Sequence, residues 1–215
     1  MRVMVVAMAA LALFAGCGGG GKDSSEEQPA EATPNIVQPG APGEPSRKLT
    51  PEEAAKVGSV EVTEADVQFM QDMIHHHSQA IEMTDWVPSR ASSRGVKVIA
   101  QRMQASQEAE IEVMERWLQA QGAEPPSDHA DHGGKLMPGM LTDAQMDRLE
   151  AGDGRRFDRM FLRYMTQHHR GALQMVNDLR ESGGGLQSEI DKLAREVATD
   201  QEIEILRMRD LLGAR

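Results

Sequence analysis

The sequence predicts an all-α protein whose main domain is a four-helix bundle, built from two tandem helical hairpins joined by a long crossover. Composition is the first observation: aromatic residues make up 3% of the 215-residue chain and methionine occurs 15 times. Strands favour aromatic and β-branched residues, whereas the abundant Ala, Leu, Glu and Gln favour helices. An internal repeat and apolar residues spaced three and four apart are the other two observations.

Charge and cysteine content exclude several functional classes. The chain has 34 acidic and 23 basic residues and a formal net charge of -11. Nucleic-acid binding is disfavoured, because it needs clustered Lys and Arg, and a cation is the more natural partner. A single cysteine excludes an internal disulfide framework and any Cys-rich zinc or iron–sulfur site.

Residues 1–16 have the pattern of an export signal. Arg2 is followed by an apolar run that ends in small residues and is too short to span a membrane. The stretch from Leu13 to Cys17 resembles the lipobox of bacterial lipoproteins. This resemblance implies cleavage before Cys17, lipidation of its sulfur, and a place on the outer face of a bacterial membrane, periplasmic or at the cell surface. The alternative is an ordinary signal peptide with an unmodified Cys17.

Residues 17–48 are predicted to form a disordered tether. They are rich in Gly, Pro and acidic residues, and Ile36 and Val37 are their only large apolar side chains. Such a segment buries too little apolar surface to offset the entropy of ordering the chain. We expect it to hold the following domain clear of the membrane.

The domain at 49–215 is a tandem repeat, with repeat one at 49–121 and repeat two at 141–215. Leu49-Thr50-Pro51 recurs 92 residues later as Leu141-Thr142-Asp143. The segment FMQDMIHHHSQAIEM (69–83) aligns with FLRYMTQHHRGALQM (161–175) at the same offset. Later in each repeat the offset becomes 94, so that Gln107 and Glu110 align with Gln201 and Glu204.

Each repeat is predicted to be a helical hairpin. Apolar residues in steps of three and four mark one face of each helix. The first helix stops before Pro88 and the second is closed by Gly122, as helix-stop rules require. Thr50 and Pro51, followed by Glu53, predict a helix start, so that short lead-in helices precede both hairpins. The four main helices are expected at about 63–87, 95–121, 154–182 and 187–212.

The crossover at 122–140 is long enough to run the length of the bundle. We therefore expect the first helices of the two repeats to be antiparallel and related by a pseudo-two-fold axis, with equivalent residues at one level. The crossover also contains His129 and His132 between aspartates. These residues are either a weak metal-capture site or an ordinary polar loop.

Two histidine pairs interrupt the apolar core stripes, His76-His77 in repeat one and His168-His169 in repeat two. A buried imidazole needs a partner, and four of them at one level indicate a shared metal ion. Neighbouring residues point about 100° apart on a helix. We expect His76 and His168 to face the bundle axis.

The residues around the histidines favour copper. Met73 and Met165 lie within one helical turn, and thioether with imidazole selects copper, Cu(I) or Cu(II), whereas zinc prefers thiolate or carboxylate. Met83 and Met175 lie roughly 10.5 Å further along their helices and belong to another layer. The second histidine of each pair either ligates from the rim, binds a second ion, or hydrogen-bonds a residue of the neighbouring helix. Four residues are available for such a hydrogen bond, namely Gln107, Glu110, Gln201 and Glu204.

This repeated motif resembles the bacterial DUF305 family over about residues 60–212. The resemblance implies a ferritin-like four-helix bundle, export from the cytoplasm, and copper binding or copper resistance. Carried over to this chain, the implied metal residues are Met73, His76, His77, Met83, Met165, His168, His169 and Met175. His75 aligns with Gln167 and is left out of the site.

Several functions remain open on this evidence. The leading hypothesis is an extracytoplasmic, lipid-anchored protein that binds, buffers or passes on copper, the last requiring a copper-handling partner protein. A di-iron oxidase on the same bundle is the enzymatic alternative, although the chain lacks the Glu-x-x-His motif of such sites. A metal-free helical interaction module, with histidines satisfied by Gln and Glu, is the third.

Overall fold

The computed structural model describes residues 36–39, 43, 45–56, 60–124, 126 and 136–213. The chain divides into two units, residues 1–55 and 56–215. The predicted export signal, the lipidation site Cys17 and the loop histidines His129 and His132 lie outside the described residues.

In the first unit, the described residues form two short strands and most of a short helix that ends at Lys56. Strand β1 (Ile36–Gln38) pairs antiparallel with β2 (Arg47–Leu49), and Ile36 lies opposite Leu49. This pairing differs from the tether expected through residue 48, and it uses the two large apolar residues of that segment. Helix α1 (Pro51–Lys56) follows as the first lead-in helix. Its start is fixed by reciprocal hydrogen bonds between Thr50 and Glu53.

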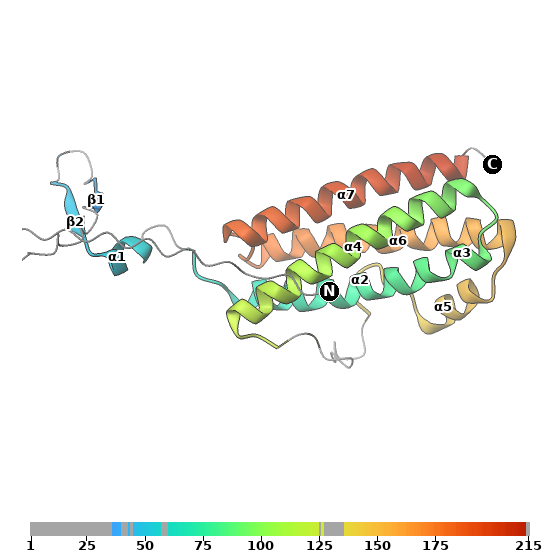
Figure 1. Cartoon of the computed structure of the whole chain (residues 1–215), viewed down its shortest axis with the longest axis horizontal. Helices are drawn as coiled ribbons and strands as arrows, with labels where there is room; N and C mark the ends of the chain where they lie inside the picture. The colour runs from blue at the N-terminus through green and yellow to red at the C-terminus, as the bar shows by residue number, and fades with distance from the viewer. Residues whose placement is uncertain are drawn as a thin grey trace, which may run out of the picture. The chain divides into compact units, whose positions relative to one another are not determined.

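The second unit is the predicted four-helix bundle (Figure 1). Helices α2 and α4 form one hairpin, α6 and α7 form the other, and α2 packs against α6. The N-terminal part of α2 lies beside the C-terminal part of α6, so these two helices are antiparallel as predicted. The helices are α2 (Glu64–Asp85), α3 (Val87–Arg90), α4 (Arg94–Gln121), α5 (Asp143–Glu150), α6 (Gly154–Glu181) and α7 (Ser188–Gly213).

Local sequence rules account for the helix ends. Thr63 and Asp66 form a capping box at the start of α2, and Thr142 forms one with Gln145 at the second lead-in helix, α5. Gly122 ends α4 with φ of 68°, a left-handed conformation that glycine adopts without the strain of a Cβ.

Two buried aspartates tie each hairpin to the other. Asp66 of α2 accepts a hydrogen bond from the backbone N–H of Gly185, in the turn between α6 and α7, at 2.6 Å. Its repeat counterpart Asp158 of α6 accepts from the hydroxyl of Ser92 at 2.7 Å, before α4. The backbone N–H groups of Ser92 and Ser93 also donate to Asp158. The pseudo-two-fold axis therefore relates contacts as well as helices.

The apolar core forms two clusters, on either side of the histidine positions along α2 and α6. One cluster includes Phe69, Met73 and Met175. The other includes Phe161 and Met165. Because α2 and α6 are antiparallel, equivalent residues of the two repeats fall in opposite clusters.

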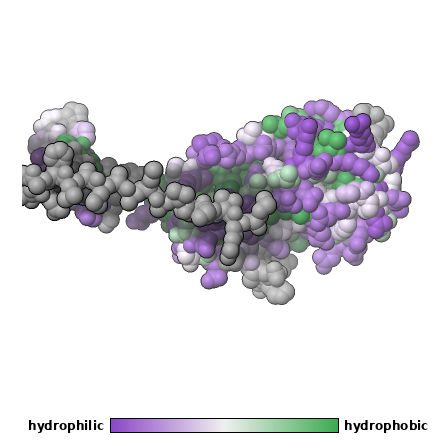
Figure 2. All heavy atoms as spheres, viewed as in Figure 1, coloured by the Kyte–Doolittle hydropathy of each residue, from purple (hydrophilic) through white to green (hydrophobic). Residues whose placement is uncertain are grey.

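The bundle surface is mostly hydrophilic on the face shown in Figure 2, with an apolar patch toward the C-terminal end of α7. Exposed apolar side chains on the outer helices include Val98 of α4 and Leu206 of α7. Among the described helices, none combines the length and apolar character needed to cross a membrane.

Candidate metal centre

Four histidines form one buried layer in the middle of the bundle. His76, His77, His168 and His169 are each at most 1% exposed. The rings of His76 on α2 and His168 on α6 lie with their centroids 3.8 Å apart. These two therefore face each other between the helices, as their positions in the apolar stripes predict. We call these four residues the histidine layer.

The second histidine of each pair turns toward the other helix of its own hairpin. His77 Nε2 lies 2.7 Å from Glu110 Oε2 on α4. His169 Nε2 lies 2.7 Å from Glu204 Oε2 on α7. The two repeats thus build the same contact from equivalent residues. Both glutamates are among the candidate partners that the sequence analysis names for the second histidines.

The predicted role of the two glutamines as histidine partners is not supported by the structure. Gln107 and Gln201 are each 2% exposed. Within the described part of the chain, the amide nitrogen and oxygen of Gln107 have no hydrogen-bond partner. The amide oxygen of Gln201 has none there either. The carboxylates one turn further along α4 and α7 take the contact instead, because a charged acceptor makes the stronger hydrogen bond.

Hydrogen bonds fix which ring nitrogen carries the proton in three of the four histidines. His76 Nε2 lies 3.0 Å from the carbonyl oxygen of Pro138, which can only accept, so Nε2–H donates. His77 and His169 donate in the same way to carboxylates. In the neutral form of such a ring Nδ1 is a lone pair, and among the described residues none of these three Nδ1 atoms has a partner. His168 has no well-formed hydrogen bond at either ring nitrogen there.

Burial keeps three imidazoles of the layer uncharged. Desolvation, and next the neighbouring His77, lower the pKa of His76 from 6.5 to about 3, although the bond to Pro138 favours the charged form. Desolvation and His76 lower the pKa of His168 well below 6.5, against a smaller opposing effect of the His76 backbone. Desolvation also lowers the pKa of His169, and Glu204 counteracts it in part. These three imidazoles are neutral at pH 7, the form that binds metals.

The end of the crossover forms a strap over His76, which we define as residues Met137–Leu141. Gln79 of α2 holds Leu141 at both backbone atoms, with Leu141 N donating to Gln79 Oε1 at 2.8 Å. Gly171 of α6 lets the strap approach closely, since a Cβ there would lie 1.9 Å from the Pro138 oxygen. The strap therefore holds the Pro138 carbonyl in place against the His76 ring.

The strap was not foreseen from the sequence. Its one available clue is Gly171, a glycine inside a long helix, where glycine costs about 1 kcal/mol relative to alanine and so signals a close approach. Gly139, the strap residue that Gly171 approaches, has a φ of 78° and lies 32 residues earlier in the chain. No repeated spacing in the sequence links these two glycines.

Residues 66–212 match DUF305, which is described as a domain of unknown function. The chain belongs to the DUF305 family. A comparison with the curated proteins gives no match.

Solved structures of DUF305 proteins share this fold. A DUF305 fragment from Deinococcus radiodurans is 30% identical with a TM-score of 0.65, covering 73% of this chain and 100% of that one. A DUF305 protein from Streptomyces coelicolor, whose name calls it secreted, is 34% identical with a TM-score of 0.61, over 70% and 91% of the two chains.

CopM is a third structural relative of this DUF305 domain. Its Cu(I)-bound form is 28% identical with a TM-score of 0.57, and the match covers 69% of this chain and 96% of CopM. CopM has also been solved bound to Cu(II), bound to Ag, and in the apo form.

The four methionines of the predicted site lie in different places in this DUF305 domain. Met73 and Met165 are fully buried and flank the histidine layer from opposite sides. Met83 packs in the cluster of Phe161, and Met175 in the cluster of Phe69. The antiparallel helices therefore separate the methionines that the repeat aligns.

Among the described residues, no group of three or more His, Cys, Asp or Glu side chains is arranged to bind one metal ion. The rings of His76 and His168 are in contact, with their planes tilted by 35°. A metal ion between them requires the rings to separate. The histidine layer thus offers unpaired donor atoms and a closed geometry.

Proposed function

We propose that this DUF305 protein binds copper through the histidine layer, in a role of buffering or delivering the ion outside the cytoplasm. The observation that carries this proposal is the pairing state of the imidazoles. His76, His77 and His169 each donate Nε2–H to a carbonyl or carboxylate and leave a buried Nδ1 unpaired.

This arrangement is the usual one for a histidine that binds a metal, whose second nitrogen donates to a backbone carbonyl or a carboxylate. It also needs an explanation, because a buried polar atom without a partner costs about 1 to 3 kcal/mol. A bound metal ion would satisfy several such atoms at once.

Copper is favoured by the donors near the layer. Met73 and Met165 add thioethers, and soft sulfur with imidazole suits Cu(I), while imidazole also accepts Cu(II). The chain has one cysteine, at position 17 and far from the bundle in sequence, so thiolate-rich zinc binding lacks its ligands. The structures of CopM with Cu(I), Cu(II) and Ag support this choice.

Export and lipid anchoring complete the proposal. The apolar segment 1–16, the lipobox-like stretch ending at Cys17 and the secreted name of the Streptomyces coelicolor relative support a place outside the cytoplasm. An anchor at Cys17 would keep the copper-binding bundle at the membrane surface. Replacing Cys17 with Ser should release the protein into the soluble fraction.

A di-iron oxidase is the second candidate, and one observation favours it. Glu110 and Glu204 come from two helices and contact histidines of the other two. Di-iron sites also need a Glu three residues before each histidine. Ile74 and Thr166 occupy those positions, so the two carboxylates of that motif are missing.

Competitive titration of the full chain with Cu(I), Cu(II), Zn(II) and Fe(II) tests the proposal. We expect tight copper binding, and we expect its loss in the double variant His76→Asn/His168→Asn. His75→Asn is the matched control, because this half-buried histidine lies on the same turn of α2 outside the layer. Far-UV circular dichroism of each variant checks that the helices are intact.

Unchanged copper affinity in the folded double variant would show that the layer is structural and would overturn the proposal. Binding of two irons with consumption of oxygen would support the oxidase instead.

A further inference from the structure

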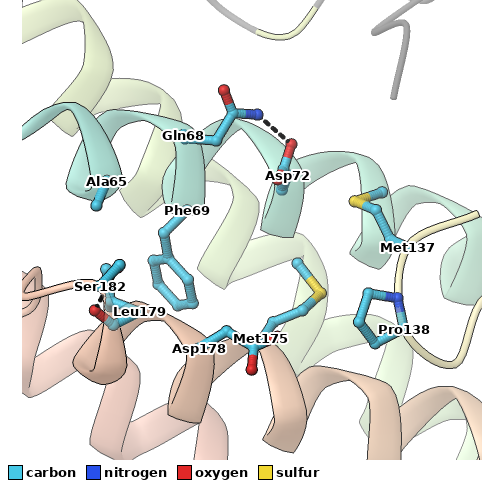
Figure 3. Close-up of a pocket in the computed structure, with 10 residues that line it drawn as sticks. All are labelled: Ala65, Gln68, Phe69, Asp72, Met137, Pro138, Met175, Asp178, Leu179 and Ser182. Atoms are coloured by element: carbon cyan, nitrogen blue, oxygen red, sulfur yellow. Dashed lines mark hydrogen bonds between the residues drawn. The ribbon is translucent and has the colours of Figure 1, made fainter. Parts of the chain in front are cut away.

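A pocket of about 330 Å³ opens between α2, α6 and the strap, next to the histidine layer. Phe69 and Asp72 line it from α2, Met175 and Asp178 from α6, and Met137 and Pro138 from the strap. Figure 3 shows Met175 extending from α6 toward the two strap residues. Two thioethers from different segments therefore border one cavity.

The chemistry of this pocket suits a soft cation. Met137 and Met175 are each 7% exposed, so their side chains are held in place rather than free in solvent. Thioether sulfur is uncharged and binds soft monovalent ions such as Cu(I) in preference to hard divalent ions. Asp72, which also accepts a hydrogen bond from Gln68 at 2.6 Å, and Asp178 give the pocket a negative potential that attracts cations.

The pocket is separated from the histidine layer by one strap residue. Pro138 lines the pocket, and its carbonyl oxygen accepts the hydrogen bond from His76 Nε2. A movement of this residue would therefore connect the pocket with His76. The repeat counterpart of Met175, Met83, is fully buried.

We infer that this pocket is an outer site for Cu(I), held by Met137 and Met175, from which the ion passes to the histidine layer when the strap moves off His76. Two thioethers bind Cu(I) more weakly than a site that includes imidazoles, so transfer runs inward. The ion keeps its oxidation state and no electron is exchanged. This inference rests on the proposed copper binding by the layer and adds the route by which the ion reaches it.

Methionine methyl NMR tests the outer site in the parent protein. The full chain, labelled with ¹³C at the methionine methyl groups, is titrated with Ag(I), a redox-inert soft cation. We expect the methyl signals of Met137 and Met175 to shift at the lowest Ag(I) additions. Met140 is the internal control, because it lies on the same strap but does not line the pocket. Unshifted signals of Met137 and Met175 at saturation would overturn the outer site.

Loading kinetics test the route. In the variant Met137→Leu/Met175→Leu, the rate of Cu(I) uptake by the histidine layer should fall below that of the parent, while its equilibrium affinity changes far less. The control is Met140→Leu, with an unchanged rate. An uptake rate equal to that of the parent in the double variant would overturn the route.

The outer site and the proposed function fail separately. If His76→Asn/His168→Asn keeps the parent copper affinity, the proposed function fails. If the Met137 and Met175 signals stay unshifted in the parent while copper still binds the layer, the outer site fails and the proposed function stands.

Discussion

The two hairpins present the same histidines, yet only one of them lies under the strap. In both repeats a glutamate holds the second histidine and an aspartate binds the opposite hairpin. The first histidines differ: His76 donates to Pro138, whereas His168 has no well-formed hydrogen bond among the described residues. The glutamate contacts that the repeats share hold the histidine layer together. The contact of Pro138 with His76 occurs in repeat one alone among the described residues, and the proposed route of the ion depends on it.

The same division appears along α2 and α6. Position 79 in repeat one is Gln79, which binds the strap, and its counterpart in repeat two is Gly171, which makes room for it. A duplicated sequence therefore supplies two different parts of one contact. The predictions below separate the shared features from the differing ones, beginning with the largest effect.

The first prediction concerns pH and the metal-free protein. The lowered pKa values of His76, His168 and His169 mean that unfolded chains bind protons that the folded protein excludes. Stability is therefore full above pH 6.5 and falls as pH drops below it, by about 1.4 kcal/mol per pH unit for each excluded proton. Urea denaturation between pH 7 and pH 5 measures this slope. His168→Asn should reduce it by one proton; a slope equal to that of the parent protein would contradict the account.

The second prediction compares the buried aspartates. Asp158→Ala leaves three donors of the opposite hairpin without their acceptor and should cost about 3 kcal/mol of unfolding free energy. Asp66→Ala loses a capping box and one cross-hairpin bond and should cost about 2 kcal/mol. Chemical denaturation measures both. Asp143→Ala, at an exposed position in the first turn of α5, is the control.

The third prediction concerns the strap. Gly171→Ala places a methyl group against the backbone of Pro138 and should displace the strap at a cost of roughly 2 kcal/mol. The His76 ring should then lose its bond to Pro138 and exchange its Nε2 proton faster. Gly213→Ala, with no atom near its added Cβ, is the control. Retention of a slowly exchanging His76 proton in Gly171→Ala would show that the strap does not depend on this approach.

The fourth prediction tests how alike the repeats are. Glu110→Leu and Glu204→Leu each leave a buried imidazole N–H unpaired, and each should cost about 1 to 2 kcal/mol. Because the two contacts have the same length and similar burial, the two losses should agree within about 0.5 kcal/mol. A clear difference between the two losses of unfolding free energy in urea denaturation would show that the two contacts contribute unequally to stability.

The smallest effect is expected at Asp200, whose counterpart in repeat one is Ser106. Desolvation, Glu110 and Glu204 raise the pKa of Asp200. Its carboxylate is therefore less stable in the folded protein than in the unfolded chain. Asp200→Ser should therefore stabilise the protein, by only a few tenths of a kcal/mol because this carboxylate is exposed and screened. Thermal denaturation at low salt gives the sign.

The sequence predicted the features that follow from periodicity and repetition. The hairpins, the capped lead-in helices and the meeting of His76 with His168 all derive from spacing and from the 92-residue offset. The choice of Glu110 over Gln107 as histidine partner depends on side-chain reach between packed helices, and both lay among the predicted candidates.

Features that depend on contacts between distant segments were not predictable in this way. The Pro138 carbonyl meets His76 over a separation of 62 residues, through a strap without periodic sequence. The pairing of β1 with β2 is carried by backbone hydrogen bonds, which composition does not reveal.

The central claim is that the histidine layer holds metal through Nδ1, with Nε2–H bonded to the protein in the loaded state as in the apo state. Long-range ¹H–¹⁵N correlation spectra of the ¹⁵N-histidine-labelled full chain, recorded with and without Cu(I), test it directly. The account predicts Nε2–H tautomers for His76, His77 and His169 in the apo protein, and a Cu(I)-induced shift at Nδ1 of residues in the layer. Nδ1–H tautomers in the apo protein, or spectra that Cu(I) leaves unchanged, would contradict it.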